Sequence, residues 1–291
     1  MWVKGFGHVI YKIQNEMLIV EVDSCGAEWK SVTDKKSQKE YLWNKKIDAW
    51  QYCAPILFPV IGRLKNDSYQ WDGEFYSMPK HGFCFDLPFE VHQQKKNKIT
   101  FVLSETLETF AIYPFRFQLV ISYTLKERSL VTSFIVTNQS EYEMYFSLGT
   151  HPSFCCNQWD KLEFEYPETI PAYRMNDEYL LDGRRDEIFN GGNEIILDSK
   201  VFQDGALIFP NLRSKFVILK SAYGKPRIQM ELCAPYLGIW SIPGEDYICI
   251  EPWFGIDDFT THNGKIEEKR GICTLKPQEE FSYDYLVTFY E

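Results

Sequence analysis

Polar and apolar residues alternate with a period of two along much of this chain. The pattern is clearest near the C-terminus, where large apolar or aromatic residues stand at positions 281, 283, 285, 287 and 289. Such alternation is typical of a β-strand that buries one face. The same pattern predicts further strands at 117–123, 130–137, 143–148, 215–219 and 226–232.

Turn residues between these segments indicate antiparallel pairing. Asp72-Gly73 separates 68–71 from 74–77, and this is a two-residue hairpin signal because glycine accepts positive φ. Helical periodicity is weak and is confined to 105–112 and 266–270, so β-α-β units are not expected. We therefore predict an all-β fold in which two large antiparallel sheets pack face to face as a β-sandwich.

The chain contains no signal of an internal boundary. It lacks a long Pro/Gly/Ser-rich linker, a fixed-period repeat and a low-complexity tract. We predict a single domain over residues 1–291, with two β domains as the alternative.

Composition and charge narrow the class of protein. Hydrophobic residues make up 45% and aromatic residues 16% of the chain, which excludes intrinsic disorder. There are 31 Lys and Arg against 41 Asp and Glu, a net charge of −10 that disfavours a nucleic-acid partner. No apolar stretch approaches the ~20 residues that cross a bilayer.

The start of the chain and the cysteines bear on its compartment. Residues 1–5 lack the features of a secretory signal, so we expect a cytoplasmic protein that does not span a membrane. The eight cysteines are scattered and form no CxxC pair, so we expect reduced thiols rather than disulfides or a zinc site.

Three cationic or titratable side chains interrupt apolar or tight local sequence. Arg63 follows an apolar run that ends in Gly62, and its guanidinium could grip hydroxyls or a carboxylate; pairing with a surface carboxylate is the alternative. His81 stands in a loop, and His151 stands where a strand meets Pro152. A histidine there could act as general acid or base, or simply be structural.

Two carboxylates are also candidates. Asp204 precedes an apolar strand and could be a turn residue. Glu251 ends the apolar run 248–250 and precedes Trp253 and Phe254. Such surroundings could raise the pKa of the Glu251 carboxyl toward that of a general base; a glutamate held by an arginine is the alternative.

Motifs for other chemistries are absent from the sequence. There is no phosphate-binding loop, dinucleotide fingerprint, zinc-peptidase motif or EF-hand loop. His81, His151 and Glu251 also lack the spacing of a local metal cluster, so we expect no metal ion.

Short motifs run in a fixed order along nearly the whole chain: Gly26-Ala27-Glu28, Tyr41-Leu42-Trp43, Phe58-Pro59-x-x-Gly62-Arg63, His81-Gly82-Phe83, Tyr113-Pro114-Phe115-x-Phe117, Gly149-x-His151-Pro152-x-Phe154, Asp204-x-x-x-x-Phe209 and Ile250-Glu251-Pro252-Trp253. In this order they resemble the galactose mutarotase (aldose 1-epimerase) family, most closely its bacterial LacX-like branch. The resemblance implies a β-supersandwich, in agreement with the strand pattern.

The resemblance also implies an activity: interconversion of the α and β anomers of a hexose such as galactose, by ring opening without cofactor or metal. Glu251 matches the general base that takes the proton from the C1 hydroxyl. His151 matches the general acid that protonates the ring oxygen. The remaining matches are to residues expected to hold the sugar, namely Arg63, His81 and Asp204, with Trp253 packing on its apolar face.

Two departures from the family pattern bear on the substrate. The LacX-like and hexose-6-phosphate epimerase branches usually carry Arg two residues after the Phe of the His-Gly-Phe motif, where this chain has Phe85. Together with the charge of −10, this favours a neutral sugar. Thr150 and Ser153 replace small residues around His151 and are expected to reshape the pocket.

Other functions remain open at this point. They are a hexose-6-phosphate 1-epimerase, a carbohydrate-binding or sensor protein with weak catalysis, and a glycoside hydrolase using Asp204 and Glu251, whose carboxylates would then stand about 5–10 Å apart. In each case the expected partner is a small-molecule sugar, and the protein could be a monomer or a homodimer.

Overall fold

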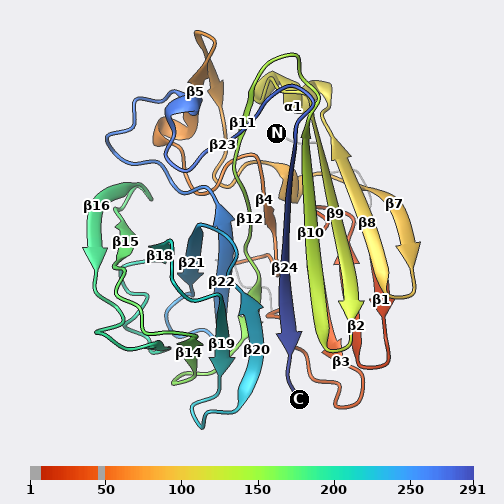
Figure 1. The fold of residues 1–291 in the computed structure, drawn as a ribbon, viewed down its shortest axis with the longest axis vertical. Helices are drawn as coiled ribbons and strands as arrows, with labels where there is room; N and C mark the ends of the chain where they lie inside the picture. Colours follow the sequence, from red (N-terminus) through yellow and green to blue (C-terminus); the bar gives the residue numbers. More distant parts are fainter. Residues whose placement is uncertain (1–7, 45–49) are drawn as a thin grey trace.

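Most of the chain is β-strand. The computed structural model describes residues 8–44 and 50–291 (Figure 1). Residues 1–5, on which the expectation of no secretory signal rests, lie outside the described residues. All pairings between the named strands of the described part are antiparallel, as expected from the hairpin signals.

The largest sheet has its longest strands in the middle. Within the described residues its order is β17 (Glu194–Ile196), β14 (Lys161–Phe164), β19 (Phe216–Lys220), β20 (Pro226–Glu231), β24 (Glu280–Phe289), β10 (Ser129–Asn138), β9 (Phe117–Lys126), β8 (Lys98–Ser104) and β7 (Glu90–Lys95). β9 alternates buried and half-buried residues along almost its whole length. One face of this sheet therefore supplies core side chains, as its period-two pattern dictates.

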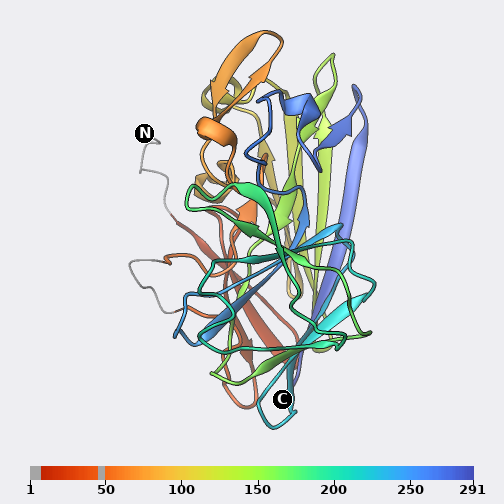
Figure 2. The same ribbon diagram turned by 90° about the vertical axis from the view of Figure 1, so that its left-hand side faces the viewer.

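The second large sheet carries the candidate chemistry. Its order is β16 (Leu181–Asp186), β15 (Ala172–Met175), β18 (Leu207–Pro210), β21 (Tyr236–Trp240), β22 (Tyr247–Phe254), β12 (Leu148–Thr150) and β4 (Ile56–Leu57), with β13 (Ser153–Cys155) also paired to β22. β22 is buried along its length except at Phe254, and it is paired on both edges, with β21 on one side and with β12 and β13 on the other. Figure 2 turns the β15–β16 side of this sheet toward the viewer.

Smaller elements complete the fold. They are the sheet β1 (Ile10–Gln14), β2 (Leu18–Asp23) and β3 (Trp29–Asp34), the pairs β5 (Ser68–Trp71) with β6 (Glu74–Ser77) and β11 (Met144–Phe146) with β23 (Cys273–Leu275), the helix α1 (Leu107–Ile112), and the 3₁₀ turns η1 (Lys65–Asp67), η2 (Cys84–Asp86) and η3 (Ile266–Glu268).

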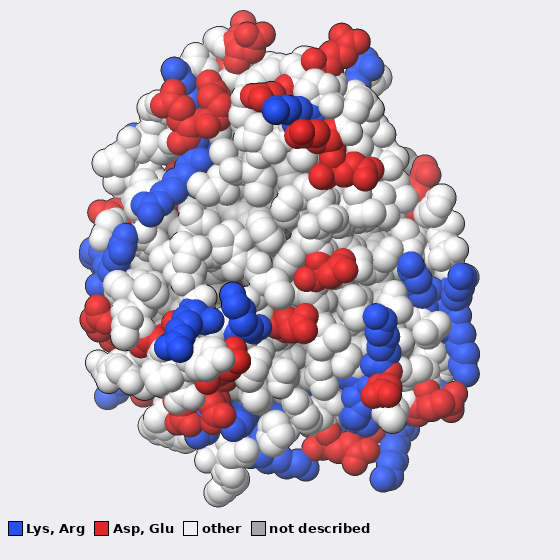
Figure 3. All heavy atoms as spheres, viewed as in Figure 1, with Lys and Arg blue, Asp and Glu red and all other residues white. Residues whose placement is uncertain are grey.

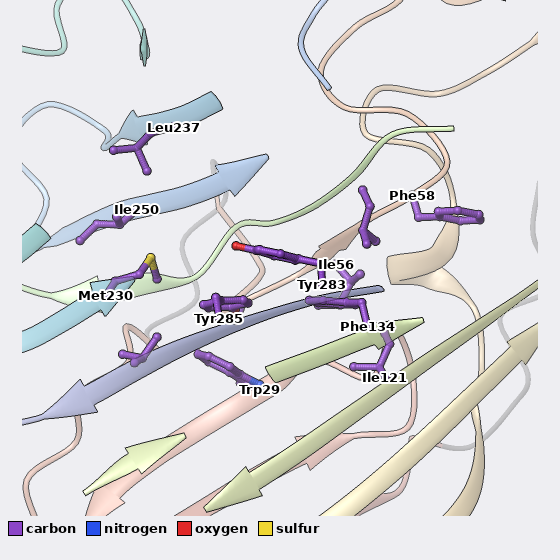
Figure 4. Packing of buried hydrophobic residues seen from close by; sticks show 14 of the residues in the cluster. Trp29, Ile56, Phe58, Ile121, Phe134, Met230, Leu237, Ile250, Tyr283 and Tyr285 are labelled. Carbon is purple, nitrogen blue, oxygen red and sulfur yellow. The ribbon is translucent and has the colours of Figure 1, made fainter. Parts of the chain in front are cut away.

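A continuous apolar core joins the two large sheets. Phe134 and Tyr285 from the nine-stranded sheet belong to the same buried cluster as Leu237 and Ile250 from the second sheet (Figure 4). Trp29 from β3 joins this cluster and lies 6.3 Å from Tyr285 between ring centroids. The aromatic residues thus fill the wide space between sheets, and the predicted large antiparallel β-sandwich is confirmed.

The local predictions are confirmed with two differences. Asp72 and Gly73 both have positive φ and join β5 to β6, as a two-residue turn requires. The strand predicted at 143–148 is two strands, because β11 pairs with β23 and β12 with β22. The helix predicted at 266–270 is only the 3₁₀ turn η3; the chain becomes extended at Lys269, whose buried ammonium contacts Asp258 and the Ile256 carbonyl.

Three further observations concern the cysteines, the membrane and the surface. No disulfide joins any of the eight cysteines, all of which lie in the described residues. No helix in the described part is long and apolar enough to cross a membrane. On the face seen in Figure 3, Lys and Arg side chains are interspersed with Asp and Glu side chains.

Candidate active site

A cavity of about 750 Å³ opens beside β22. Its walls come from segments far apart in the sequence, and its lining residues are Trp50, Tyr52, Lys80, His81, Phe85, His151, Met175, Asn176, Asp177, Tyr179, Arg184, Gln203, Asp204, Gly205, Ala206, Trp240, Glu251, Trp253 and Asp257. A volume of this size accommodates a small organic molecule such as a monosaccharide. Five of the six predicted site residues meet here.

Glu251 lies in the buried interior of β22. Its side chain is 1% exposed, and its strand neighbour across the ladder is Gly238. Gly238 leaves room for the Trp253 indole, because a side chain at 238 would overlap that ring. Burial raises the pKa of Glu251 well above its usual range, with Asp257 reinforcing and Lys80 opposing the shift.

His151 faces Glu251 from the neighbouring strand. It follows β12, and its backbone N–H donates to the Pro55 carbonyl at 3.0 Å. His151 Nε2 lies 3.2 Å from Glu251 Oε2, although Oε2 forms no hydrogen bond with the described residues. Burial lowers the pKa of His151 to about 3, and Lys80 adds to this shift. Burial thus favours a pair with no net charge.

Two consecutive backbone amides orient two other cavity residues. The Gly62 N–H donates to His81 Nδ1 at 3.1 Å, so a neutral His81 carries its proton on Nε2. The Arg63 N–H donates to Asp257 Oδ1 at 2.9 Å. Gly62 has φ of +66°, and any Cβ there would overlap the Asp257 carboxylate, so glycine is required. The backbone of the Gly62-Arg63 motif therefore orients two side chains that line the cavity.

Aromatic rings line the wall next to His151. Trp50 lies over the imidazole with 4.5 Å between ring centroids, and Trp240 meets the same imidazole at 5.8 Å and nearly at right angles. Tyr52 continues the row from Trp50 and contacts Phe85 at 5.4 Å. Rings of this kind offer apolar faces to the C–H groups of a sugar, with Tyr and Trp keeping a polar edge.

Carboxyl groups outnumber cationic groups in the lining. Asp177, Asp204, Glu251 and Asp257 face two cations, Lys80 and Arg184, among the described lining residues. Both cations already have partners: Lys80 Nζ lies 4.4 Å from the centre of the Tyr179 ring, and Arg184 is paired with Asp182 at 2.8 Å. Burial raises the pKa of Asp257. The cavity is therefore better suited to hydroxyl groups than to a dianion.

The structure does not bring Arg63 into the cavity lining. Its guanidinium forms two hydrogen bonds with the Asp67 carboxylate, at 2.6 and 2.7 Å, and a third with the Glu178 carbonyl at 3.2 Å. This is the alternative of a surface ion pair that the sequence left open. A sugar-binding role for this side chain stays a prediction, and it requires the guanidinium to leave Asp67 or the sugar to reach the rim.

The departures from the family pattern have different positions. Phe85 lines the cavity, as expected for a residue that bears on the substrate. Thr150 and Ser153 are buried but are not among the lining residues, and Ser153 Oγ donates to the Cys53 carbonyl. The expectation that they reshape the pocket is therefore not supported by a direct contact with the cavity.

Sequence reasoning missed several lining residues. The candidates were chosen as polar residues that interrupt an apolar run. This criterion could not identify Trp50, Tyr52 and Trp240, because their segments contain no such interruption. Asp257 lies only six residues after Glu251, but its position beside Gly62 depends on a contact between distant segments. Only the high aromatic content hinted at the Trp50–Trp240 wall.

The sequence of this chain matches a known protein family and a known protein. The family model described as aldose 1-epimerase matches residues 9–270. The chromosomal protein LacX of Lactococcus lactis subsp. lactis is 28% identical over 298 residues, covering 95% of this chain and 98% of that protein.

Solved structures of similar fold point to the same family. A galactose mutarotase related enzyme from Lactobacillus acidophilus has a TM-score of 0.92 and 34% identity, covering 97% of this chain and 98% of its own. A galactose mutarotase-like protein from Lactobacillus casei has a TM-score of 0.91 and 27% identity, covering 97% and 100%.

Proposed function

The chain belongs to the aldose 1-epimerase family, and from this premise we propose that it interconverts the α and β anomers of a neutral hexose, with Glu251 as general base and His151 as general acid. The observation that carries the proposal is the close approach of His151 Nε2 to Glu251 Oε2, 3.2 Å apart at the cavity wall. The C1 hydroxyl oxygen and the ring oxygen of a pyranose are bonded to the same carbon. An acid and a base that act on both must therefore stand side by side.

The reaction would proceed by ring opening. The form that reacts has the single proton of the pair on His151, which Glu251 can pass to Nε2 across 3.2 Å. Glu251 then takes the proton of the C1 hydroxyl while His151 donates its own to the ring oxygen, so the C1–ring oxygen bond breaks and an aldehyde forms. Rotation about C1–C2 presents the other face of the aldehyde. Closure with the two roles reversed returns both protons and gives the other anomer. General acid and base catalysis each supply about 10²–10⁴-fold.

The surrounding residues would hold the sugar. His81 offers an Nε2 donor, since its Nδ1 accepts from Gly62, and Asp204 and Asp257 offer acceptors. Trp253 and the Trp50–Trp240 wall would pack on the C–H faces. Such a mixture of a few fixed polar groups with apolar walls is typical of a small-molecule site.

The direct test is the rate of mutarotation. Freshly dissolved α-glucose and α-galactose would be followed by polarimetry with and without the protein, in a buffer of low intrinsic catalysis. We expect a rate proportional to protein concentration. No acceleration with any of several aldoses would contradict the proposal, and sugar binding without acceleration would favour a sensor instead.

We expect a neutral hexose to be preferred over its 6-phosphate, with kcat/KM higher by about tenfold or more, since the two cations of the lining already have partners and Asp177 and Asp204 repel a dianion. Coupled or NMR exchange assays on glucose and glucose 6-phosphate would measure this ratio. Phe85→Arg should shift it toward the phosphate, and Phe110→Arg, at a half-exposed position on α1, is the matched control. A wild-type preference for the phosphate would favour the hexose-6-phosphate epimerase alternative.

We expect kcat/KM to fall on the high-pH side of the profile, as pH passes the raised pKa of Glu251. The reaction needs one dissociable proton on the His151–Glu251 pair. With the pKa of Glu251 raised and that of His151 lowered to about 3, the pair keeps this proton across the acidic range and loses it as pH passes the raised pKa. Initial rates corrected for buffer catalysis would give the profile.

Lys80 provides the control for this pH dependence. It opposes the rise in the pKa of Glu251, so Lys80→Gln should move the high-pH limb of the profile to higher pH. A profile that instead rises into the alkaline range and stays high would mean that the pair needs no proton, and the assigned roles would be wrong.

A further inference from the structure

A thiol stands beside the His151–Glu251 pair. Cys249 lies on β22 two residues before Glu251, so both side chains leave the strand on the same face. Cys249 Sγ, the His151 ring nitrogen and a Glu251 carboxylate oxygen all lie within 4.8 Å of one another. No step of the proposed epimerisation uses this thiol.

We propose that His151, Cys249 and Glu251 form a three-ligand site for a thiophilic divalent cation such as Zn²⁺ or Cd²⁺, and that this cation inhibits the enzyme. A thiolate, an imidazole and a carboxylate are the ligand types that zinc takes in proteins. Three protein ligands leave the fourth coordination position for water or a sugar oxygen. That position would face the cavity, because His151 and Glu251 line it.

The geometry is close to that of a bound ion. Metal distances of about 2.3 Å to sulfur and about 2.0–2.1 Å to nitrogen and oxygen place tetrahedral ligand atoms roughly 3.5 Å apart. His151 Nε2 and Glu251 Oε2 are already at 3.2 Å, and because the three ligand atoms lie within 4.8 Å of one another, the thiol has to move by at most about 1.3 Å. A rotamer change of Cys249 provides movement on this scale.

Two buried polar atoms of the cluster lack hydrogen-bond partners. Glu251 Oε2 and His151 Nδ1 have no hydrogen-bond partner among the described residues, although the two side chains are 1% and 8% exposed. A buried polar atom without a partner is costly, and a bound water or ion is one way to satisfy it. A divalent ion with a thiolate and a carboxylate is neutral overall, so this buried site could hold it without a net charge.

Packing alone does not account for the position of the thiol. Cys249 also belongs to a small apolar cluster with Trp43 and Tyr247. These neighbours account for a small apolar side chain at this fully buried position. It does not explain the approach of Sγ to two titratable side chains. In the described part of the chain, this is the one group of three possible metal-ligating side chains.

Inhibition rests on the proposed function, whereas metal binding does not. On binding, the thiol and the pair give up their protons to solvent, and the ion takes the place of the proton that epimerisation needs. The cation would therefore block both proton transfers. It would also compete with the sugar, because its open position lies where the anomeric oxygens are expected.

The test is a titration of the reduced protein with Cd²⁺, whose bonds to thiolate give a distinct ultraviolet charge-transfer absorption. We expect this absorption to saturate at one equivalent and mutarotation to be lost over the same range. Cys249→Ser and Cys249→Ala should lose the absorption and weaken Cd²⁺ binding by at least about tenfold. Cys233→Ser, at an exposed cysteine, is the matched control and should behave like the wild type.

The outcomes separate the two proposals. Absorption that persists in both Cys249 variants, or that disappears in Cys233→Ser, would overturn the metal site while leaving mutarotation untouched. Stoichiometric binding that depends on Cys249 but leaves mutarotation unaffected would overturn the inhibition and, with it, the roles of His151 and Glu251. Circular dichroism and thermal unfolding of each variant would establish that it is folded.

Discussion

Glu251→Gln is expected to lower the rate of anomer interconversion by about 10²–10⁴-fold, the contribution of a general base. The amide has nearly the same shape as the carboxyl but cannot accept the C1 hydroxyl proton. Burial raises the pKa of Glu251, so its surroundings disfavour the charged carboxylate, and a neutral amide is not penalised by the same burial. The fold should therefore be retained. Polarimetry gives the rate, and thermal unfolding gives the stability.

Glu168→Gln is the matched control for this variant. Glu168 is as buried as Glu251, at 2% exposed, but it accepts backbone hydrogen bonds from Arg213 and Ser214 and does not line the cavity. We expect this control to lose stability rather than activity per folded molecule. Near-normal turnover by folded Glu251→Gln would show that another group is the base, and Asp257 would be the first alternative to examine.

The fold was largely predictable because it depends on local patterns. The alternation at 281–289 is a strand in the structure, and Asp72-Gly73 is the predicted turn. Period-two burial and positive φ are properties of short segments, so the sequence carries them directly. The division of 143–148 into two strands was not predictable, because it depends on which distant strand each half pairs with.

The site was predictable where a residue type is unusual for its surroundings. A glutamate inside the apolar strand β22 and a histidine at the end of β12 both stood out, and they lie 3.2 Å apart. The Trp50–Trp240 wall was not predictable, because aromatic residues are ordinary in a core. For Arg63 the motif was identified, but the side chain is not the part that reaches the cavity residues. The Arg63 backbone N–H contacts Asp257, whereas the guanidinium pairs with Asp67.

His151→Asn should also lower turnover by about 10²–10⁴-fold, because asparagine can donate a hydrogen bond to the ring oxygen but cannot transfer a proton. Binding should change less than turnover, since His81 and the acidic residues of the lining remain. A KM near that of the wild type with a strongly reduced kcat would therefore be expected from NMR exchange measurements. His92→Asn, on the exposed face of β7, is the matched control.

The double variant distinguishes a concerted pair from two independent contributions. If Glu251 and His151 act on geminal oxygens in one step, removing either already disables that step, and the second substitution should add far less than its own single effect. The double variant should then be only slightly slower than the slower single variant. Effects that multiply would show that the two groups act in separate steps, and near-full activity of His151→Asn would show that the ring oxygen takes its proton from elsewhere, such as His81 Nε2.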